Sequence, residues 1–184
     1  MIRAFVPNDD PDIDFVWEWF EYQAALLDDS RDEVLQRVMS GGSAPRRHEA
    51  RFVGLTRDEV EEYFDALRDQ LELLTMFELP GTTEAIMRID FRGRVAAEKE
   101  DGLSKRYRDL DKIRGKKIRL KEDLLGAMKS EVTEPKAVSA FRGALHLRDW
   151  IAHGRQWQPR LGRRYTPNDV FDICRDLIDS IPLS

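Results

Sequence analysis

Residues 134–155 read EPKAVSAFRGALHLRDWIAHGR, and this stretch decides the fold. Its apolar residues recur at spacings of three and four, from Val138 through Phe141 to Leu145. A second stripe of alanine, leucine and isoleucine runs beside the first. Apolar positions at this spacing form one face of a helix. The pattern therefore predicts a helix from about Glu134 to Ala152 that is buried in a bundle of helices.

Charged and titratable side chains gather at the end of this predicted helix. Arg148 falls on the apolar face, where an unpaired guanidinium would cost on the order of several kcal/mol. Asp149 and His153 are four residues apart and share a face, so the carboxylate can orient the imidazole. Gly154 follows as a helix stop. On the residues alone, the favoured interpretation is a structural ion pair from Arg148 to a neighbouring helix, with His153 capping the helix end.

A second interpretation comes from a resemblance. Arg148, four intervening residues and His153 at a helix end resemble the signature of the HEPN superfamily, in which a His follows an Arg after four to six residues. The residue after the Arg is commonly Asn, Asp or His in that family, and here it is Asp149. The motif lies on the penultimate predicted helix of a chain that is predicted to be all-helical. The resemblance covers residues 148–153 as a motif and most of the chain as architecture, without indicating a subfamily.

The resemblance implies a metal-independent endoribonuclease that needs no cofactor. In many HEPN proteins two signature helices meet across a twofold axis, so we expect a homodimer formed through the helix that carries Arg148 and His153. We expect His153 to exchange protons, Arg148 to neutralise phosphoryl charge and Asp149 to hold His153. The implied context is a toxin–antitoxin or defence system, with an antitoxin or regulatory protein as a partner. Some family members carry a modified Tyr two positions after the His. Arg155 stands there, so that regulation is not carried over.

Length, composition and cysteine content indicate the fold class and the cellular compartment of the protein. The chain has 184 residues, of which 41% are hydrophobic and 35% charged, and its net charge is −5. The pattern predicts an all-α bundle of about five to six helices with an antiparallel core, and the resemblance implies that this core is HEPN-like. We expect a single domain over residues 1–184, with residues 1–54 as an N-terminal helical appendage and linker. Cys174, the sole cysteine, is expected to be a core side chain. One cysteine, no secretory signal and no apolar run of membrane-spanning length predict a cytoplasmic protein without membrane contact.

Capping and breaking residues predict where the other helices begin and end. A helix is expected from Asp12 through Leu27, and a second short one from Ser30 to Met39. Thr56 with Glu59 is a capping box that opens a further helix, and Pro80-Gly81 is expected to end that helix. Thr82 or Thr83 is expected to cap the next helix, and Thr166 with Pro167 and Asp169 to cap the last one.

Two regions favour RNA as a partner. Residues 104–121 are the most basic part of the chain and are predicted to form a helix that includes Lys116 and Lys117. The loop after His153 combines guanidinium groups, which bind phosphate, with aromatic rings that stack on bases. Its predicted RNA-binding residues are Arg155, Trp157, Arg160, Arg163 and Arg164. Residues 8–33 are acidic, so the alternative that the basic and acidic segments pack together, or are solvated faces, stays open.

Two alternatives to an enzyme also remain open. One is a non-catalytic helical module that binds RNA or nucleotides through its basic surface. The other is a helical protein-interaction module whose interface is its function. The first would bind RNA with or without His153, and the second would have no RNA affinity at all.

Overall fold

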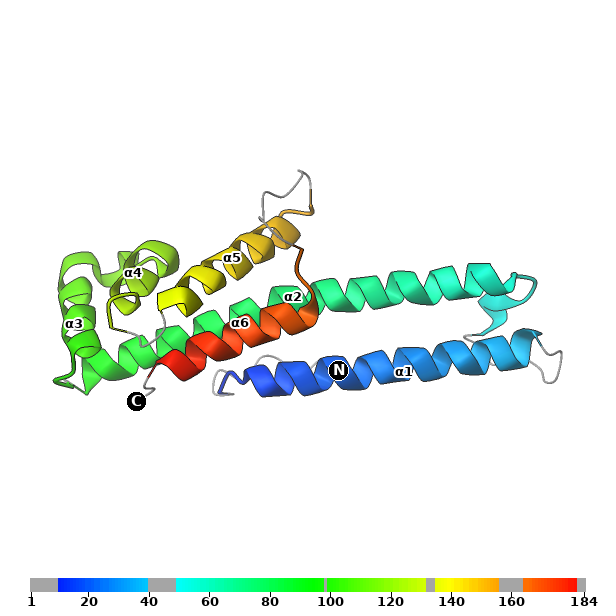
Figure 1. Ribbon diagram of the computed structural model, residues 1–184, viewed down its shortest axis with the longest axis horizontal. Helices are drawn as coiled ribbons and strands as arrows, with labels where there is room; N and C mark the ends of the chain where they lie inside the picture. The colour runs from blue at the N-terminus through cyan, green and yellow to red at the C-terminus, as the bar shows by residue number, and fades with distance from the viewer. Residues whose placement is uncertain (1–9, 40–48, 98, 132–134, 156–163, 182–184) are drawn as a thin grey trace. The chain divides into compact units, whose positions relative to one another are not determined.

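In the computed structural model the described residues, which are 10–39, 49–97, 99–131, 135–155 and 164–181, form helices and turns without a strand (Figure 1). The predicted all-α bundle of five to six helices is thus confirmed. The α-helices are α1 (Ile13–Met39), α2 (Arg57–Ala96), α3 (Gly102–Arg114), α4 (Leu125–Met128), α5 (Pro135–Ala152) and α6 (Pro167–Ser180). The shorter elements are the 3-10 helices η1 (Ala50–Phe52) and η2 (Gly115–Lys117) and the π-helix η3 (Leu120–Leu124).

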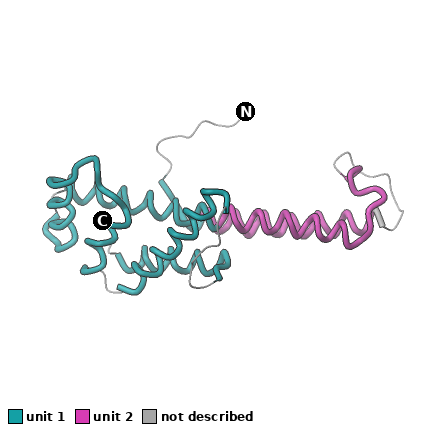
Figure 2. The backbone as a smooth tube through the Cα atoms, turned by 90° about the horizontal axis from the view of Figure 1, so that it is seen from above, with its two compact units in different colours: residues 1–14, 76–184 teal, residues 15–75 magenta. Residues whose placement is uncertain are grey.

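The chain divides into two compact units, shown in different colours in Figure 2. Unit 1 comprises residues 1–14 and 76–184, and unit 2 comprises residues 15–75. Unit 2 therefore includes the first part of α2, beyond the appendage over residues 1–54 that the sequence predicts. Whether that appendage is separate from a single HEPN-like domain stays a prediction. The Arg148 site belongs to unit 1.

Unit 2 pairs α1 with the first part of α2. The predicted break at Ser30 is wrong, because α1 continues through it to Met39. Its apolar face does not stop at this point: Leu27 packs against both core clusters of the unit, and Val34 is buried in one of them. Arg31 pairs with the carboxylates of Asp28 and Asp32 along the same helix, which further supports the helical conformation there.

The predicted break at Pro80-Gly81 is also wrong, because α2 contains Pro80 in its interior. Proline removes one backbone hydrogen bond and normally interrupts a helix. Here Leu79 and Met87, on either side of the proline, are completely buried, and their packing outweighs the local preference. Thr83 does not cap a new helix, since its hydroxyl donates to the carbonyl oxygen of Leu79 at 2.9 Å.

In unit 1, α5 packs against α6 (Figure 1). The predicted bounds of α5 are confirmed within one residue, and Val138, Phe141 and Leu145 are completely buried. Thr166 and Asp169 form the predicted capping box at the start of α6. Cys174 is buried in this core, and burial raises the pKa of its thiol to about 12.

The basic segment over residues 104–121 is not one helix. α3 ends at Arg114, and Gly115 has a φ of +50°, which glycine adopts without steric cost. Residues Gly115–Lys117 then form η2, and η3 follows from Leu120. Tyr107 of α3 packs against Phe91 of α2, with ring centroids 5.0 Å apart. The other capping box, Thr56 with Glu59, opens α2 as predicted.

Two helical glycines lead to opposite stability predictions. Gly81→Ala should stabilise the protein by roughly 0.5–1 kcal/mol, because alanine is the better helix former and no atom lies within 4 Å of the added Cβ. Gly143→Ala should destabilise it, because the new Cβ would collide with the Tyr165 hydroxyl. Thermal unfolding of both variants beside the wild type tests this. Equal midpoints for the two variants would contradict it.

Candidate functional site

Arg148 lies near the end of α5, and its guanidinium reaches across to α2. Its Nη1 donates to Oε2 of Glu84 at 2.6 Å, and its Nη2 donates to Oδ1 of Asp149 at 3.1 Å. Arg88, one turn after Glu84 on α2, donates to Oε1 of Glu84 at 2.8 Å. The apolar-face guanidinium therefore has the partners that its burial requires. The contact with Glu84 is also the interhelical ion pair that the structural interpretation predicts.

Asp149 is held between two cations. Its Oδ1 accepts from Arg148, and its Oδ2 accepts from Nζ of Lys121 at 2.5 Å. Arg142 of α5 donates to the backbone carbonyl of Lys121 at 3.0 Å, which fixes the start of η3 beside α5. We call Glu84, Arg88, Lys121, Arg148 and Asp149 the charge cluster. It holds three cationic and two anionic side chains, and it is partly open to solvent.

Hydrogen bonds outweigh burial in setting the pKa values of Glu84, Asp149 and Arg148. Burial by itself would raise the pKa of Glu84, but hydrogen bonds from Arg148 and Arg88 lower it below its usual value. Burial would likewise raise the pKa of Asp149, yet Lys121 and Arg148 lower it. Burial would lower the pKa of Arg148, and its bonds to the two carboxylates raise it instead. Both carboxylates are therefore charged at neutral pH.

His153 is the C-cap residue of α5, with an exposed side chain. The backbone N–H of Gly154 donates to Ile151 and that of Arg155 to Trp150, both at 3.1 Å. This pair of bonds is a Schellman motif, and it requires a left-handed residue after the cap. Gly154 has a φ of +71°, which confirms the predicted glycine stop. The Asp149 carboxylate is engaged by cations, and its predicted role of orienting the His153 imidazole stays a prediction.

The predicted RNA-binding residues are only partly described. Arg155 is exposed and has a φ of +59°, and Arg164 is exposed just before α6. Lys116 and Lys117 are exposed on η2. Within the described ranges, no hydrogen bond or ion pair joins any of these four to Arg148. The remaining three predicted residues, Trp157, Arg160 and Arg163, lie outside the described part of the chain.

Three members of the charge cluster, Glu84, Arg88 and Lys121, are not among the site residues that the sequence predicts. Glu84 is recognisable from sequence as the helical partner of Arg88, but its bond to Arg148 spans 64 positions. Lys121 is the last cation of the basic segment, and 28 positions separate it from Asp149. The sequence indicates a partner for Arg148 only indirectly, because a guanidinium on a buried face must have an acidic neighbour.

Comparisons of the chain with protein-family models, curated proteins and solved structures found no match. Among the residues that the structure describes, no group of three or more His, Cys, Asp or Glu is placed to hold a metal ion. None of the helices in the described ranges combines the length and apolar character needed to cross a membrane.

Acid should weaken the charge cluster through Glu84. A carboxylate whose pKa is lowered by folding stabilises the native state above its unfolded pKa, and that contribution is lost as pH falls through the folded value. The free energy of unfolding of unit 1 should therefore fall below about pH 4.5, the ordinary pKa of Glu, and Glu84→Gln should make this fall shallower. Urea titrations from pH 6 down to about pH 3 test this, with the exposed Glu18→Gln as the control. An equally steep fall of the unfolding free energy with pH in Glu84→Gln and Glu18→Gln would contradict this prediction.

Proposed function

We propose that the protein is a metal-independent endoribonuclease that cleaves single-stranded RNA as a homodimer, with Arg148 and His153 of both copies at a shared site. The observation that supports this is the placement of the two side chains at one helix end. Arg148 is partly buried and rigidly held, while His153 is exposed one turn later. A held cation and an accessible proton carrier are groups that phosphodiester transesterification requires. Because five residues place the two about 140° apart around one helix, a second copy is needed to bring a cation and a histidine to one phosphate.

The chemistry starts at the 2′-hydroxyl of the RNA. The His153 imidazole of one copy removes its proton while the 2′-oxygen forms a bond to the adjacent phosphorus. The bond from phosphorus to the 5′-oxygen breaks, and His153 of the other copy protonates the leaving oxygen. Arg148 stabilises the negative charge that develops on the phosphoryl oxygens. The products are a 2′,3′-cyclic phosphate and a 5′-hydroxyl.

The carboxylate partners of Arg148 fit this role. An arginine has five N–H donors, and the contacts to Glu84 and Asp149 use one on each terminal nitrogen. Donors remain for a phosphate, and the two carboxylates fix the plane in which they point. Lys121, on the other side of Asp149, brings a second positive charge to the same place. The carboxylates lower the net positive charge of the free site, so phosphate binding depends on aligned donors more than on bulk attraction.

The decisive experiment incubates the full chain with a labelled single-stranded RNA in excess chelator. Cleavage to cyclic-phosphate ends is expected, and a substrate with a single 2′-deoxy linkage should resist cleavage at that linkage alone. Sedimentation of the same preparation should show a dimer. No cleavage, cleavage of the deoxy linkage, or an active monomer would each overturn the proposal.

The ion pair between Arg148 and Glu84 specifically favours a second candidate, a non-catalytic RNA-binding or protein-interaction module. A guanidinium bound to carboxylates on its own helix and on the neighbouring helix is a common way to hold two helices together. Under this candidate the exposed Lys116 and Lys117 would carry RNA affinity. Binding of uncleaved RNA, unchanged in His153→Ala and weakened in Lys116→Ala/Lys117→Ala, would select it. Absence of any RNA binding would leave protein interaction.

A further inference from the structure

α1 carries a second apolar stripe that the core does not use. Phe15, Trp19, Tyr22 and Leu26 are 67%, 36%, 64% and 41% exposed. Their spacings of four, three and four place them on one side of the helix over three turns. At 100° per residue this side lies roughly 150° around the helix from the face that buries Phe20 and Ala24. We call these four residues the aromatic stripe.

The second helix of unit 2 also carries exposed apolar side chains. Leu67 and Leu74 of α2 are seven residues apart and both exposed. Leu67 also lines a pocket of about 220 Å³ together with Ser30 and Glu33 of α1. Ser30 and Glu33 continue the aromatic stripe beyond Leu26 at the next helical spacings, so the stripe leads toward this pocket.

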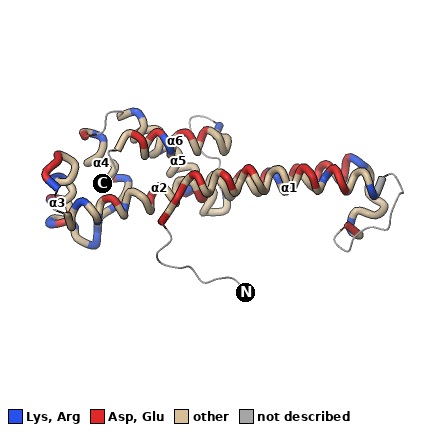
Figure 3. The backbone as a smooth tube through the Cα atoms, turned by 90° about the horizontal axis from the view of Figure 1, so that it is seen from below, with Lys and Arg blue, Asp and Glu red and all other residues tan. Residues whose placement is uncertain are grey.

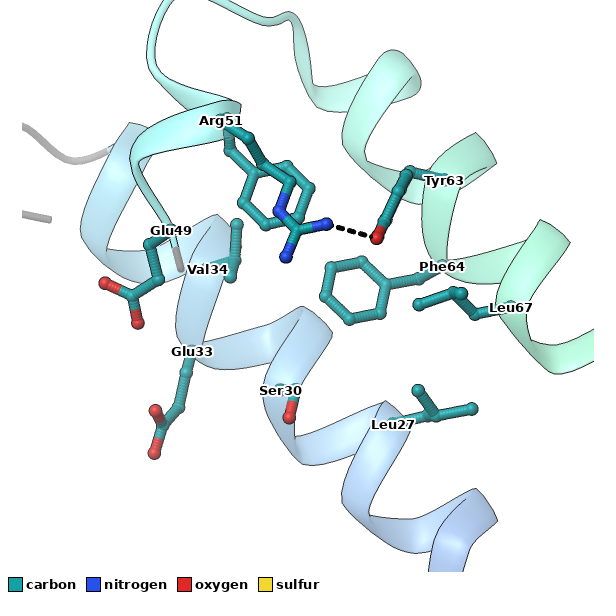
Figure 4. A pocket seen from close by; sticks show the side chains of 10 residues that line it. Leu27, Ser30, Glu33, Val34, Glu49, Arg51, Tyr63, Phe64 and Leu67 are labelled. Carbon is teal, nitrogen blue, oxygen red and sulfur yellow. Dashed lines mark hydrogen bonds between the residues drawn. The ribbon is translucent and has the colours of Figure 1, made fainter. Parts of the chain in front are cut away.

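Figure 4 shows how α1, η1 and α2 build the pocket. Phe64 and Leu67 of α2 form its apolar floor opposite Leu27 of α1. Arg51 of η1 donates to the Tyr63 hydroxyl at 2.7 Å and lies over the ring of the same tyrosine. An apolar side chain entering the pocket would therefore contact aromatic and aliphatic carbon below a polar rim.

The charge of unit 2 points to the kind of partner. Its sequence holds 14 Asp and Glu against 7 Lys and Arg, although the whole chain has a net charge of only −5. Figure 3 shows acidic residues along most of α1. Glu18 and Asp29 adjoin the aromatic stripe at helical neighbour positions and are exposed, and within the described residues neither carries an ion pair.

We propose that this face of unit 2 binds a cationic amphipathic helix of a partner protein. The apolar side of that helix lies on the aromatic stripe, and one apolar side chain near its end enters the pocket. Its Lys and Arg side chains pair with Glu18 and Asp29 at the edge. Aromatic anchors surrounded by complementary charge are typical of helix-in-groove recognition.

Other occupants fit the charges less well. A second copy of this chain would bring an equally acidic α1 against the first, and like charges across an interface are unfavourable. Helices that lie on anionic membranes carry Lys and Arg on their polar face, the opposite of α1. RNA would be repelled by the same carboxylates. A cationic helix alone satisfies both the apolar stripe and its acidic surroundings.

The test uses a fluorescent peptide made of Leu and Lys, with Leu at alternating spacings of three and four. A scrambled peptide of the same composition and a peptide with Glu in place of Lys serve as ligand controls. Anisotropy titrations compare the wild-type chain with Phe15→Ser/Tyr22→Ser. Ile113→Ser is the matched protein control, because Ile113 is 77% exposed but lies on α3. Circular dichroism confirms that each variant is folded.

The patterned Leu–Lys peptide should bind the wild type and the Ile113→Ser chain equally, and bind Phe15→Ser/Tyr22→Ser about tenfold or more weakly. Both control peptides should bind weakly, and salt should weaken the patterned peptide. No binding, or equal binding of the scrambled peptide or the double variant, would overturn the proposal. A chain dimer that the double variant abolishes would identify a second copy as the occupant and also overturn it. RNA cleavage plays no part in this readout, so the two proposals fail separately.

Discussion

His153→Ala is expected to reduce the rate of RNA cleavage in chelator by roughly 100- to 10,000-fold, the range for loss of a general acid or base. Each dimer would lose both its proton acceptor and its proton donor, so an effect near the upper end is expected. Arg148→Lys should reduce the rate as well. A lysine keeps the charge beside Glu84 but lacks the planar fork of donors. Initial rates on an end-labelled RNA, with enzyme in excess, measure the chemical step.

The matched control is His146→Ala. His146 is an exposed histidine on the same helix, seven residues before His153, so its replacement makes the same chemical change at a position to which the proposal gives no role. It should retain wild-type activity. Equal loss in both histidine variants, or full activity in His153→Ala, would contradict the assignment of His153. RNA affinity measured beside the rates separates a binding defect from a catalytic one.

Asp90→Ala is expected to lower the stability of unit 1 by about 3 kcal/mol. Both oxygens of Asp90 accept from Nε of Arg94, at 3.0 and 2.8 Å, and the two side chains are only 4% and 3% exposed. Removing the carboxylate leaves a buried guanidinium with part of its charge uncompensated. Asp101 and Ser104 still accept from Arg94, which keeps the loss at the lower end of the range for buried pairs.

Hydrogen exchange of the α5 and α6 amides in increasing urea reports this change within unit 1. The control is Glu61→Ala, which breaks an exposed ion pair with Arg57 and should leave the exchange unchanged. If Asp90→Ala also leaves the exchange unchanged, the buried Asp90–Arg94 pair does not stabilise unit 1.

Local signals in the sequence predicted much of the fold. The bounds of α5 and the caps of α2 and α6 depend on neighbouring residues, so they were predicted correctly. Ser30 and Pro80 were misread as helix boundaries because burial on both sides of each residue decides the outcome there. That burial involves residues distant in the sequence. Gly115 has the opposite effect, because it ends α3 where the apolar pattern predicts that the helix continues.

The candidate site was predictable only in part. Arg148, Asp149 and His153 lie within six positions, so their helical relationship follows from the spacing. Glu84 and Lys121 come from other elements, and only the packing of α5 against those elements brings them to the site. The sequence required that Arg148 be compensated, but it did not identify the residue that does so.

Pro80 has a consequence for cooperativity. It has no N–H to donate to the carbonyl of Met76, and Met76 is also the residue at which α2 passes from unit 2 to unit 1. Two parts of a chain unfold together when packing contacts and backbone hydrogen bonds couple them. At Pro80, α2 lacks one backbone hydrogen bond close to the position where its tertiary contacts pass from one unit to the other. The two units can therefore share one helix and still melt in separate transitions, so a single unfolding free energy would not describe the whole chain.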